Sequence, residues 1–489
     1  MTANYKTPGV YIEEISKFPP SVVAVITAVP AFIGYTEQTR FKGENLINKA
    51  VEISSLLDYE TIFGLAPIIG SFTVNIDADG KVISAISDPN SGANARFRLA
   101  NAINHYFRNR GSRCYILSIG DYTSSAINSD IVNAHVAGLA ALAKEDEPTL
   151  IVMPDLSGMS AAPPGDSAAI ASVRANYHSV LIQALNQCAK LGDRFLIGDL
   201  WDGDETGEAG IQALRDGIGT GNLKYGAIYH PFIQTTLPWR WDEDTITVSQ
   251  LASREDDGSL TQPGTYDVMT LTALQADAAN ANPTIYGNIR QALDRYSVIL
   301  PPAAAVAGVY CTVDRTRGVW KSPANESLTA VRALSVQIDD GLNDIMNVHG
   351  TGKSINAIRF FSGRGNMVWG ARTLAGNSNE WRYVSVRRFF NMVEESTKKA
   401  TEPFVFEPND ANTWTKVRAM IENFLVLQWR AGALAGAKPE HAFYVHCGLG
   451  TTMTSLDILE GRMNVEIGMA VVRPAEFIIL QFSHKMQES

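Results

Sequence analysis

The chain has 489 residues, enough for two or three domains, and its 45% apolar and 19% charged residues are typical of a globular protein. Its 41 basic and 51 acidic side chains give a formal charge of −10, which argues against nucleic acid or an anionic membrane surface as the main partner. The four cysteines form no CxxC pair, so reduced thiols in the cytosol are the simplest interpretation. No apolar run approaches a membrane span, and acidic residues before the first apolar run argue against a signal peptide.

The N-terminal third begins with a segment that predicts an extended arm. Four residues that disfavour helix (Pro8, Gly9, Pro19 and Pro20) surround the segment VYIEEI. The apolar runs VVAVITA (22–28) and AFIGYTE (31–37) then predict strands. The segments SFTVNI (71–76) and KVISAI (81–86) flank DADG (77–80), which predicts a hairpin with a four-residue turn. We expect residues 65–95 to form a surface insertion.

The middle of the chain alternates between strand and helix patterns. Continuous apolar runs predict strands at 114–120, 149–156, 194–200 and 225–233. Helical patterns lie between them at 96–111, 131–145 and 167–192. This alternation predicts a mixed α/β fold, with a largely parallel sheet covered by helices on both faces. The polar, Gly- and Asp-rich segments 201–222 and 240–284 are predicted to be surface excursions.

The last third mixes aromatic residues, arginines and glycines, and contains one strong amphipathic helix pattern at 413–434. Its apolar face contains Trp414, Val417, Ile421, Phe424 and Leu425 at helical spacing. Its polar face contains Lys416, Arg418, Glu422 and Asn423. The chain then ends with a strand signal, EFIILQF (476–482), followed by a polar tail.

Sequence motifs for catalysis and ligand binding are weak. HGTGKS (349–354) resembles the end of a phosphate-binding loop, but Asn347 occupies the position of the first glycine, and the flanking runs do not read as strand before and helix after. WDGDETGEAGIQ (201–212) begins like a calcium loop, but Ala213 replaces the bidentate glutamate. His441 and Cys447 face away from His446 if HAFYVHC is a strand. We therefore predict no catalytic, cofactor or metal residues; a nucleotide-binding enzyme with an atypical loop at 349–354 is the alternative.

Two apolar strand signals stand at the chain ends, outside the α/β alternation. An apolar edge strand is an aggregation hazard that proteins normally cover. Each strand either completes the protein's own sheet or is donated to the sheet of another chain. The N-terminal candidate consists of Val10, Tyr11, Ile12, Glu13, Glu14 and Ile15, and the C-terminal candidate of Glu476, Phe477, Ile478, Ile479, Leu480, Gln481 and Phe482.

Several long motifs resemble the contractile tail sheath proteins of phage tails and related injection systems. TPGVYIEEI (7–15) resembles the family's opening, and NHYFRNRGSRCYILSI (104–119) a later segment, with Arg110 where a glycine is usual. INAIRFFSGRGNMVWGARTL (355–374) resembles the family's Gly-Arg-Gly–Trp-Gly-Ala-Arg-Thr signature, with Ser362 where a proline is usual. Further similar segments are AGVYCTVDRTRGVWKSPAN (307–325), WRYVSVRRFFNMVEES (381–396), FEPND (406–410) and GRMNVEIGMAVVRPAEFIIL (461–480).

The resemblance implies a structural subunit, not an enzyme, that forms stacked hexameric rings around an inner tube. Contraction of the sheath would drive the tube through a target envelope, with the energy stored in a metastable extended lattice. The implied partners are further copies of the chain, the inner tube protein, baseplate and terminal cap proteins, and other sheath paralogues, without nucleic acid or direct membrane insertion. Assembly would occur in the cytoplasm, and the product would be a phage tail, a released extracellular particle or an intracellular injection device.

The resemblance also implies a domain plan. Residues 1–22 and 476–489 would be strand-exchange arms, 23–350 an outer α/β domain with insertions at 65–95 and 240–284, and 351–475 an inner α+β domain facing the tube. The helix at 414–430 is the candidate tube-facing element, through Lys416, Arg418, Glu422 and Asn423. The alternative is that this helix makes contacts only within its own subunit.

Overall fold

The computed structural model describes residues 22–69, 72–85, 93–160, 165–204, 207–255, 258–276 and 281–480. The chain divides into two compact units. Of the described residues, unit 1 contains 22–25 and 393–472, and unit 2 contains 26–392 and 473–480. No helix in these ranges is long and apolar enough to cross a membrane.

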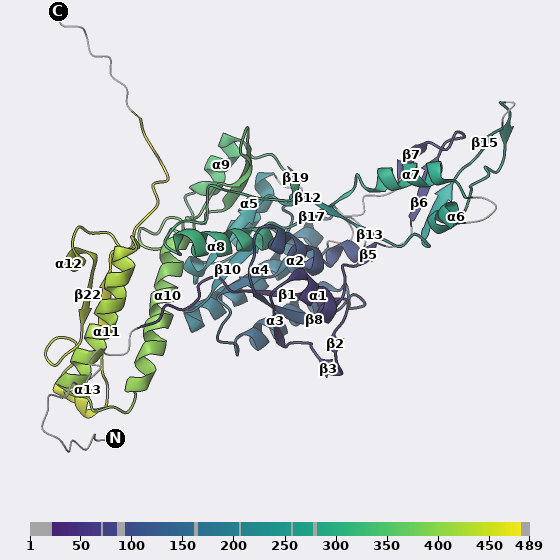
Figure 1. Cartoon of the computed structure of the whole chain (residues 1–489). Helices are drawn as coiled ribbons and strands as arrows, with labels where there is room; N and C mark the ends of the chain where they lie inside the picture. Colours follow the sequence, from purple (N-terminus) through teal and green to yellow (C-terminus); the bar gives the residue numbers. More distant parts are fainter. Residues whose placement is uncertain are drawn as a thin grey trace, which may run out of the picture. The chain divides into compact units, whose positions relative to one another are not determined.

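Unit 2 is built on a nine-stranded sheet with the order β18-β21-β20-β11-β10-β9-β1-β8-β4. Figure 1 labels its strands β1, β8 and β10 among the surrounding helices. The six strands from β20 to β8 are parallel, which confirms the predicted α/β arrangement. The parallel strands are β1 (Pro30–Thr36), β8 (Cys114–Asp121), β9 (Leu150–Val152), β10 (Phe195–Asp199), β11 (Gly226–His230) and β20 (Asn356–Phe361). The antiparallel outer strands are β4 (Ala50–Ile53), β18 (Glu326–Ser327) and β21 (Gly365–Val368).

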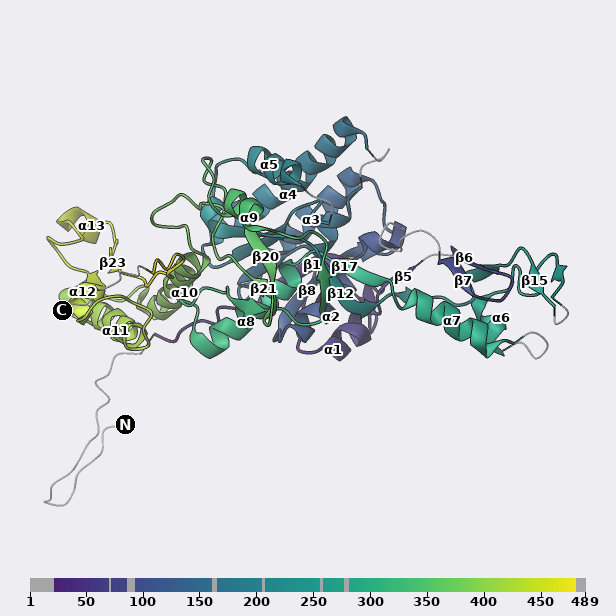
Figure 2. The ribbon, with the colours of Figure 1, turned by 90° about the horizontal axis from the view of Figure 1, so that it is seen from above.

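Helices cover both faces of this sheet, because alternate side chains of each strand point to opposite faces (Figure 2). Phe32 of β1 joins one core cluster, with α1 (Leu56–Phe63), α2 (Leu99–Arg108) and α8 (Ala303–Arg317). Its neighbour Ile33 joins the other cluster, with α3 (Asn128–Leu142), α4 (Ser167–Leu191), α5 (Glu208–Gly217) and α9 (Asp340–Asn347). Two separate apolar cores therefore hold the sheet in place.

Helix boundaries in unit 2 follow local chemistry. Asp166 caps α4 by accepting hydrogen bonds from the backbone N–H groups of Ala168 and Ala169, and Gly192 ends the helix with φ +77°. The chain leaves α2 through Arg110, whose φ is +65°. This left-handed conformation costs a non-glycine residue energy, so a glycine suits this position better.

Three expectations differ from the structure. Residues 22–29 form no strand; the backbone N–H of Val29 instead donates to the hydroxyl of Thr149. The segment 201–222 contains helix α5, which buries Ile211 and Leu214. The division between the two compact units lies between Met392 and Val393, not at the predicted residue 350, because β20 and β21 extend the main sheet.

The two predicted insertions form one packed module, here called the insertion module (72–85 and 246–293). The predicted hairpin is confirmed as β6 (Phe72–Ile76) and β7 (Val82–Ala85). Strand β14 (Ile246–Ser249) pairs in parallel with β6, and α6 (Leu271–Ala276) and α7 (Pro283–Leu293) pack against them. The shared core contains Val74, Ile76, Ile246, Val248, Leu271, Leu274, Ile285, Ile289 and Leu293.

Unit 2 also contains short strands outside the main sheet. One sheet joins β17 (Ser297–Leu300), β12 (Ile233–Pro238) and β19 (Val331–Leu334). The remaining pairs are β5 (Ile68–Ile69) with β13 (Arg240–Trp241), β2 (Arg40–Phe41) with β3 (Glu44–Asn45), and β15 (Ser253–Arg254) with β16 (Leu260–Thr261).

Unit 1 is smaller and contains the predicted amphipathic helix. Helix α10 (Val384–Thr401) includes the boundary between the units, and α11 (Ala411–Arg430) follows with Asp410 as its N-cap. The predicted apolar face of α11 is confirmed at four of its five positions, since Val417, Ile421, Phe424 and Leu425 are buried, whereas Trp414 is partly buried. The remaining elements are α12 (Pro439–Ala442), β22 (Phe443–His446), α13 (Ser455–Leu459) and β23 (Glu466–Met469).

Candidate assembly site at the root of the C-terminal arm

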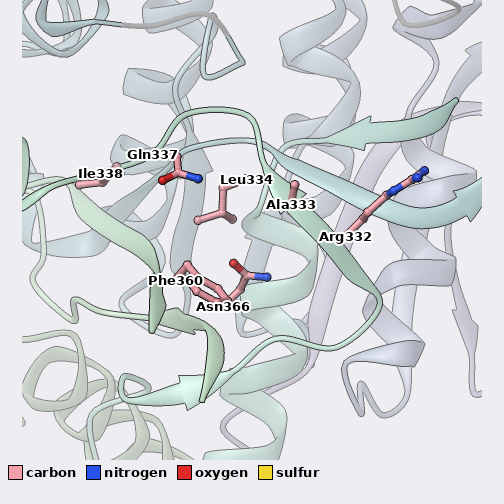
Figure 3. A pocket seen from close by; sticks show the side chains of 7 residues that line it. All are labelled: Arg332, Ala333, Leu334, Gln337, Ile338, Phe360 and Asn366. Carbon is pink, nitrogen blue, oxygen red and sulfur yellow. The ribbon is translucent and has the colours of Figure 1, made fainter. Parts of the chain in front are cut away.

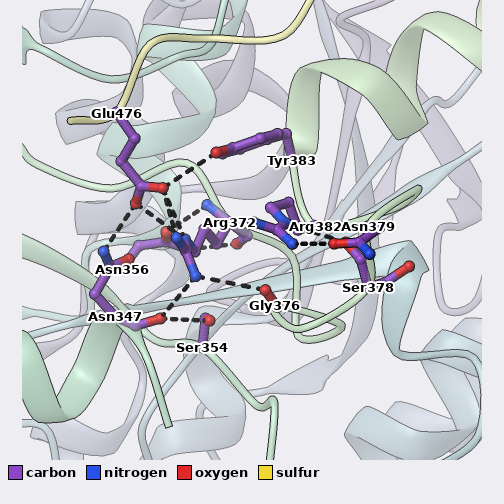
Figure 4. Close-up of polar contacts among 10 residues, drawn as sticks. All are labelled: Asn347, Ser354, Asn356, Arg372, Gly376, Ser378, Asn379, Arg382, Tyr383 and Glu476. Carbon is purple, nitrogen blue, oxygen red and sulfur yellow. Dashed lines mark hydrogen bonds and ion pairs between the residues drawn. The ribbon is translucent and has the colours of Figure 1, made fainter. Parts of the chain in front are cut away.

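The first residue of the predicted C-terminal arm, Glu476, is bound by an arginine (Figure 4). Arg372 Nε lies 2.9 Å and 3.1 Å from the two carboxylate oxygens of Glu476, and Arg372 Nη2 lies 2.6 Å from Oε2. Asn347 Nδ2 donates to Oε1 at 2.8 Å, and the Tyr383 hydroxyl to Oε2 at 3.2 Å. Both oxygens of the carboxylate are therefore satisfied, in the two-pronged geometry that guanidinium groups favour.

Arg372 is itself held in place from several sides. Its backbone N–H donates to Asn356 Oδ1 at 2.7 Å, and Asn356 Nδ2 donates back to the carbonyl of Arg372 at 2.8 Å. Its Nη1 reaches the carbonyls of Asn347 and Gly376, each at 3.4 Å. Gly370 permits this close approach, because a Cβ there would lie 2.7 Å from Asn356 Oδ1. The guanidinium is therefore held by contacts within the subunit in addition to its contact with Glu476.

Burial and charge act in opposite directions on this carboxylate. The Arg372 side chain is 5% exposed and the Glu476 side chain 22%. Burial by itself raises the pKa of Glu476, but the hydrogen bonds from Arg372, Asn347 and Tyr383 outweigh it and leave the pKa below its ordinary value. Burial and the neighbouring carboxylate raise the pKa of Tyr383. The Glu476 carboxylate is therefore charged near neutral pH.

The arm beyond Glu476 is apolar and exposed. Phe477, Ile478, Ile479 and Leu480 are between 69% and 82% exposed, and they form no strand within the described ranges. Four consecutive large apolar side chains in water are unfavourable unless another surface covers them. Gln481, Phe482 and the whole predicted N-terminal strand (10–15) lie outside the described residues. The donation of either strand stays a prediction.

Unit 1 contains a two-stranded sheet, β22 with β23. Val445 faces the core, whereas Tyr444 lies on the outer face, where its hydroxyl donates to Glu466 Oε1 at 3.0 Å. A Cβ at Gly468 would lie 2.2 Å from the Tyr444 ring, so a glycine is needed at this position. In the described part of the chain each strand pairs only with the other, so both outer edges of this sheet lack a strand partner.

The HGTGKS segment lies beside the arm root and differs from a phosphate-binding loop in its context. It follows helix α9 and precedes strand β20, the reverse of the strand–loop–helix order that a phosphate loop requires. Lys353 is 8% exposed, and its Nζ donates to the carbonyl of Arg215. Ser354 Oγ donates to the carbonyl of Asn347 at 2.6 Å, beside the Arg372 contact. The nucleotide-binding alternative therefore gains no support.

The other candidate ligand groups do not form sites. A pocket of about 280 Å³ lies beside β19, where Leu334, Ile338 and Phe360 line it (Figure 3). Its one charged residue, Arg332, donates to the carbonyl of Arg295 and away from the pocket. Asp202 of the calcium-like segment pairs with Arg174. Among the described residues no group of histidine, cysteine or acidic side chains, including His441, His446 and Cys447, could hold a metal.

The predicted tube-facing residues lie together on one side of α11. Lys416, Arg418 and Asn423 are exposed and Glu422 is partly exposed, with Arg418 Nε 3.7 Å from Glu422 Oε1. They take no part in the arm root. The sequence predicts no role in an arm contact for Arg372, Asn347 or Tyr383, although Arg372 stands in the Trp-Gly-Ala-Arg-Thr signature and Glu476 in the closing similar segment.

Comparison with known proteins defines the class. A family model, the phage tail sheath C-terminal domain, matches residues 377–485. The chain is similar to a chain of the anti-feeding prophage helical sheath in the contracted state, with 30% identity, coverage of 98% of this chain and 100% of that chain, and a TM-score of 0.61. It is also similar to a chain of the anti-feeding prophage baseplate, with 31% identity, coverage of 99% and 100%, and a TM-score of 0.61.

A curated relative is the tail sheath protein of Vibrio phage KVP40, which is 26% identical over 147 residues. That match covers 29% of this chain and spans 21% of the relative's length. The chain belongs to the family of contractile tail sheath proteins.

Proposed function

We propose that this chain is the repeating subunit of a contractile sheath, which polymerises around an inner tube and shortens to drive that tube through a target envelope. The observation that carries the proposal is the C-terminal arm, whose apolar residues 477–480 are exposed directly after a firmly bound Glu476. Likeness to a contracted helical sheath over nearly the whole chain supports it. The baseplate likeness supports a role beside baseplate proteins, and a terminal cap and an inner tube complete the partners.

The β22–β23 sheet is the proposed acceptor for the arms of neighbouring subunits. Its unpaired outer edges offer backbone N–H and C=O groups, and an added strand would satisfy them. The arm in turn needs cover for its apolar side chains, which pockets beside an edge strand provide at alternate positions. The arm of one copy would thus supply the strand that the sheet of another copy lacks. Repetition of this contact builds an open helical lattice.

The energy for contraction would come from the lattice and not from a bound nucleotide. Subunits assembled in the extended form would be kinetically trapped, with weaker contacts than in the contracted form. A gain of about 1–3 kcal/mol per subunit, typical of conformational coupling, is multiplied over the many copies of a particle. Arms linked by backbone hydrogen bonds would keep the subunits connected while they rotate as rigid bodies.

The exposed side of α11 is the proposed tube contact. Its mixture of charges, with Arg418 next to Glu422 and Lys416 exposed on the same helix, suits a wet and reversible contact that the tube could leave during contraction. Assembly would take place in the cytoplasm, followed by use in a phage tail, a released particle or an intracellular device.

Removal of the arm tests this function. A chain that lacks residues 476–489 should stay soluble and melt cooperatively, but it should form no long sheaths in negative-stain micrographs. A chain that lacks only the polar tail, 483–489, is the matched control and should form sheaths. A free peptide of residues 476–482 should not restore polymers, because it satisfies the acceptor sheet without linking two subunits. Long sheaths from the chain without 476–489 would refute the proposal.

A further inference from the structure

Within its described residues, the C-terminal arm has one polar attachment to its own subunit. Of the described residues 473–480, Glu476 alone takes part in a hydrogen bond or ion pair. Residues 477–480 extend away from it with most of their surface in water. Any pull on the arm must therefore pass through Glu476 before it reaches the folded subunit.

The contacts behind Glu476 lead directly into the main sheet. Arg372 binds the carboxylate and is fixed by Asn356, whose side chain holds both the N–H and the C=O of Arg372. Asn356 opens β20, pairs with Tyr229 of β11, and also donates through Nδ2 to the carbonyl of Ile228 at 3.2 Å. The path from the arm to β20, the outermost parallel strand of the main sheet, is thus a short series of directional bonds.

We propose that the Arg372–Glu476 pair is the mechanical root of the C-terminal arm. It transfers the pull of a second copy of this chain into the nine-stranded sheet, and it fixes Phe477 as the first residue free to pair with that copy. This inference rests on the proposed strand exchange between subunits. A two-pronged ion pair suits the task because it resists displacement in more than one direction, whereas apolar side chains can slide.

The first test measures whether the pair holds the arm in the unassembled subunit. A protease needs several flexible residues around the bond it cuts, so Glu476 should protect the bond after Phe477. Glu476→Ala should raise the rate of chymotryptic cleavage after Phe477, identified by mass spectrometry, by at least about fivefold, since local opening limits such cleavage. Glu476→Gln keeps an oxygen acceptor and loses the charge, so its cleavage rate should lie between the rates of the wild type and of Glu476→Ala. Unchanged cleavage in both variants would overturn the proposal.

The second test measures load in the assembled sheath. Sheaths of Glu476→Ala should form but break under shear, so their median length after passage through a fine needle should fall at least about threefold below wild type, because each junction lacks its directional anchor. Asp340→Ala is the matched control, because Asp340 also pairs with an arginine of unit 2, Arg359, but stands at the opposite end of α9 from Asn347 and is 93% exposed. Its sheaths should keep the wild-type length.

The outcomes separate this proposal from the proposed function. If the chain without 476–489 forms no sheaths while Glu476→Ala and Glu476→Gln form sheaths of wild-type shear resistance, strand exchange stands and the root is wrong. If the chain without 476–489 forms normal sheaths, the exchange itself is wrong. If Glu476→Ala abolishes cooperative melting, the pair has a role in folding. The cleavage rate and the sheath length of Glu476→Gln then decide whether the pair also anchors the arm.

Discussion

Lys353 and Arg215 hold each other through backbone carbonyls. Lys353 Nζ donates to the carbonyl of Arg215, and Arg215 Nε donates to the carbonyl of Lys353 at 3.1 Å. The lysine that most suggests a nucleotide site is thus committed to a contact within the subunit. Burial lowers the pKa of Lys353 and of Arg215, as expected for cations that lie largely inside the protein.

The first prediction concerns Lys353→Ala. The variant should lose about 1 kcal/mol of unfolding free energy, because it removes one hydrogen bond and leaves a buried carbonyl without that donor. Titration calorimetry with ATP and magnesium should show no saturable heat for the wild type or the variant. Saturable binding that disappears in Lys353→Ala would restore the nucleotide hypothesis.

The second prediction concerns the insertion module. Replacement of residues 72–85 by a short Gly/Ser linker should expose Ile246 and Val248, which pack against the hairpin, and should cause aggregation or loss of a cooperative melting step. Removal of 72–85 together with 246–293 should be better tolerated, because the whole core is then absent. The sequence alone suggests that the hairpin is dispensable, and the shared core argues the opposite. Calorimetry measures the melting of each variant. Cooperative melting of the chain that lacks only residues 72–85 would contradict the packing argument.

The third prediction concerns the buried pair Arg388–Asp314. Arg388 donates to both Asp314 oxygens, at 3.0 Å and 2.6 Å, and also to the carbonyl of Thr27 at 2.9 Å. Asp314→Ala should cost about 3–5 kcal/mol in denaturant unfolding, because the arginine stays buried without its counter-charge. A double change, Asp314→Leu with Arg388→Met, should recover most of that loss. A double variant as unstable as the single one would show that the charges themselves stabilise the fold.

The fourth prediction concerns pH. Burial lowers the pKa of four histidines from 6.5 to about 4; they are His105, His135, His178 and His230. Below about pH 6.5 the unfolded chain therefore binds protons that the folded chain does not, and the stability of the fold decreases on acidification. Burial raises the pKa of Asp155 to about 7 and of Asp199 to about 8 from 3.8, so the folded chain keeps these protons and stability falls as the pH rises through that window.

The balance of these groups sets a maximum. Below about pH 6.5 the four histidines outweigh the two carboxyl groups, and above it only the carboxyl groups act, so stability should be greatest near pH 6.5. Denaturant midpoints at about pH 5, 6.5 and 8 measure this directly. His135→Phe should flatten the acid side of the profile, and a midpoint that keeps rising on acidification would contradict the assignment.

The sequence by itself determined the elements whose pattern is local. Continuous apolar runs such as β1, the period of α11, the turn between β6 and β7, and Gly192 at the end of α4 follow from side-chain spacing and backbone preference over a few residues. The motif order placed the chain in its family. The apolar run 476–482 also predicts an arm from hydrophobicity alone, and its donation to another copy stays a prediction.

Only the tertiary structure decided which distant segments meet. Nothing local in the sequence indicates that β14 pairs with β6, that β20 belongs to the main sheet, or that Arg372 meets Glu476. Within the polar segment 201–222, residues 208–217 likewise form helix α5, because a neighbouring apolar cluster buries one of its faces. Pairing of strands and ion pairs far apart in the chain depends on the packing of the whole unit, since many pairings satisfy the same local pattern and only one also fills the core and matches every buried charge.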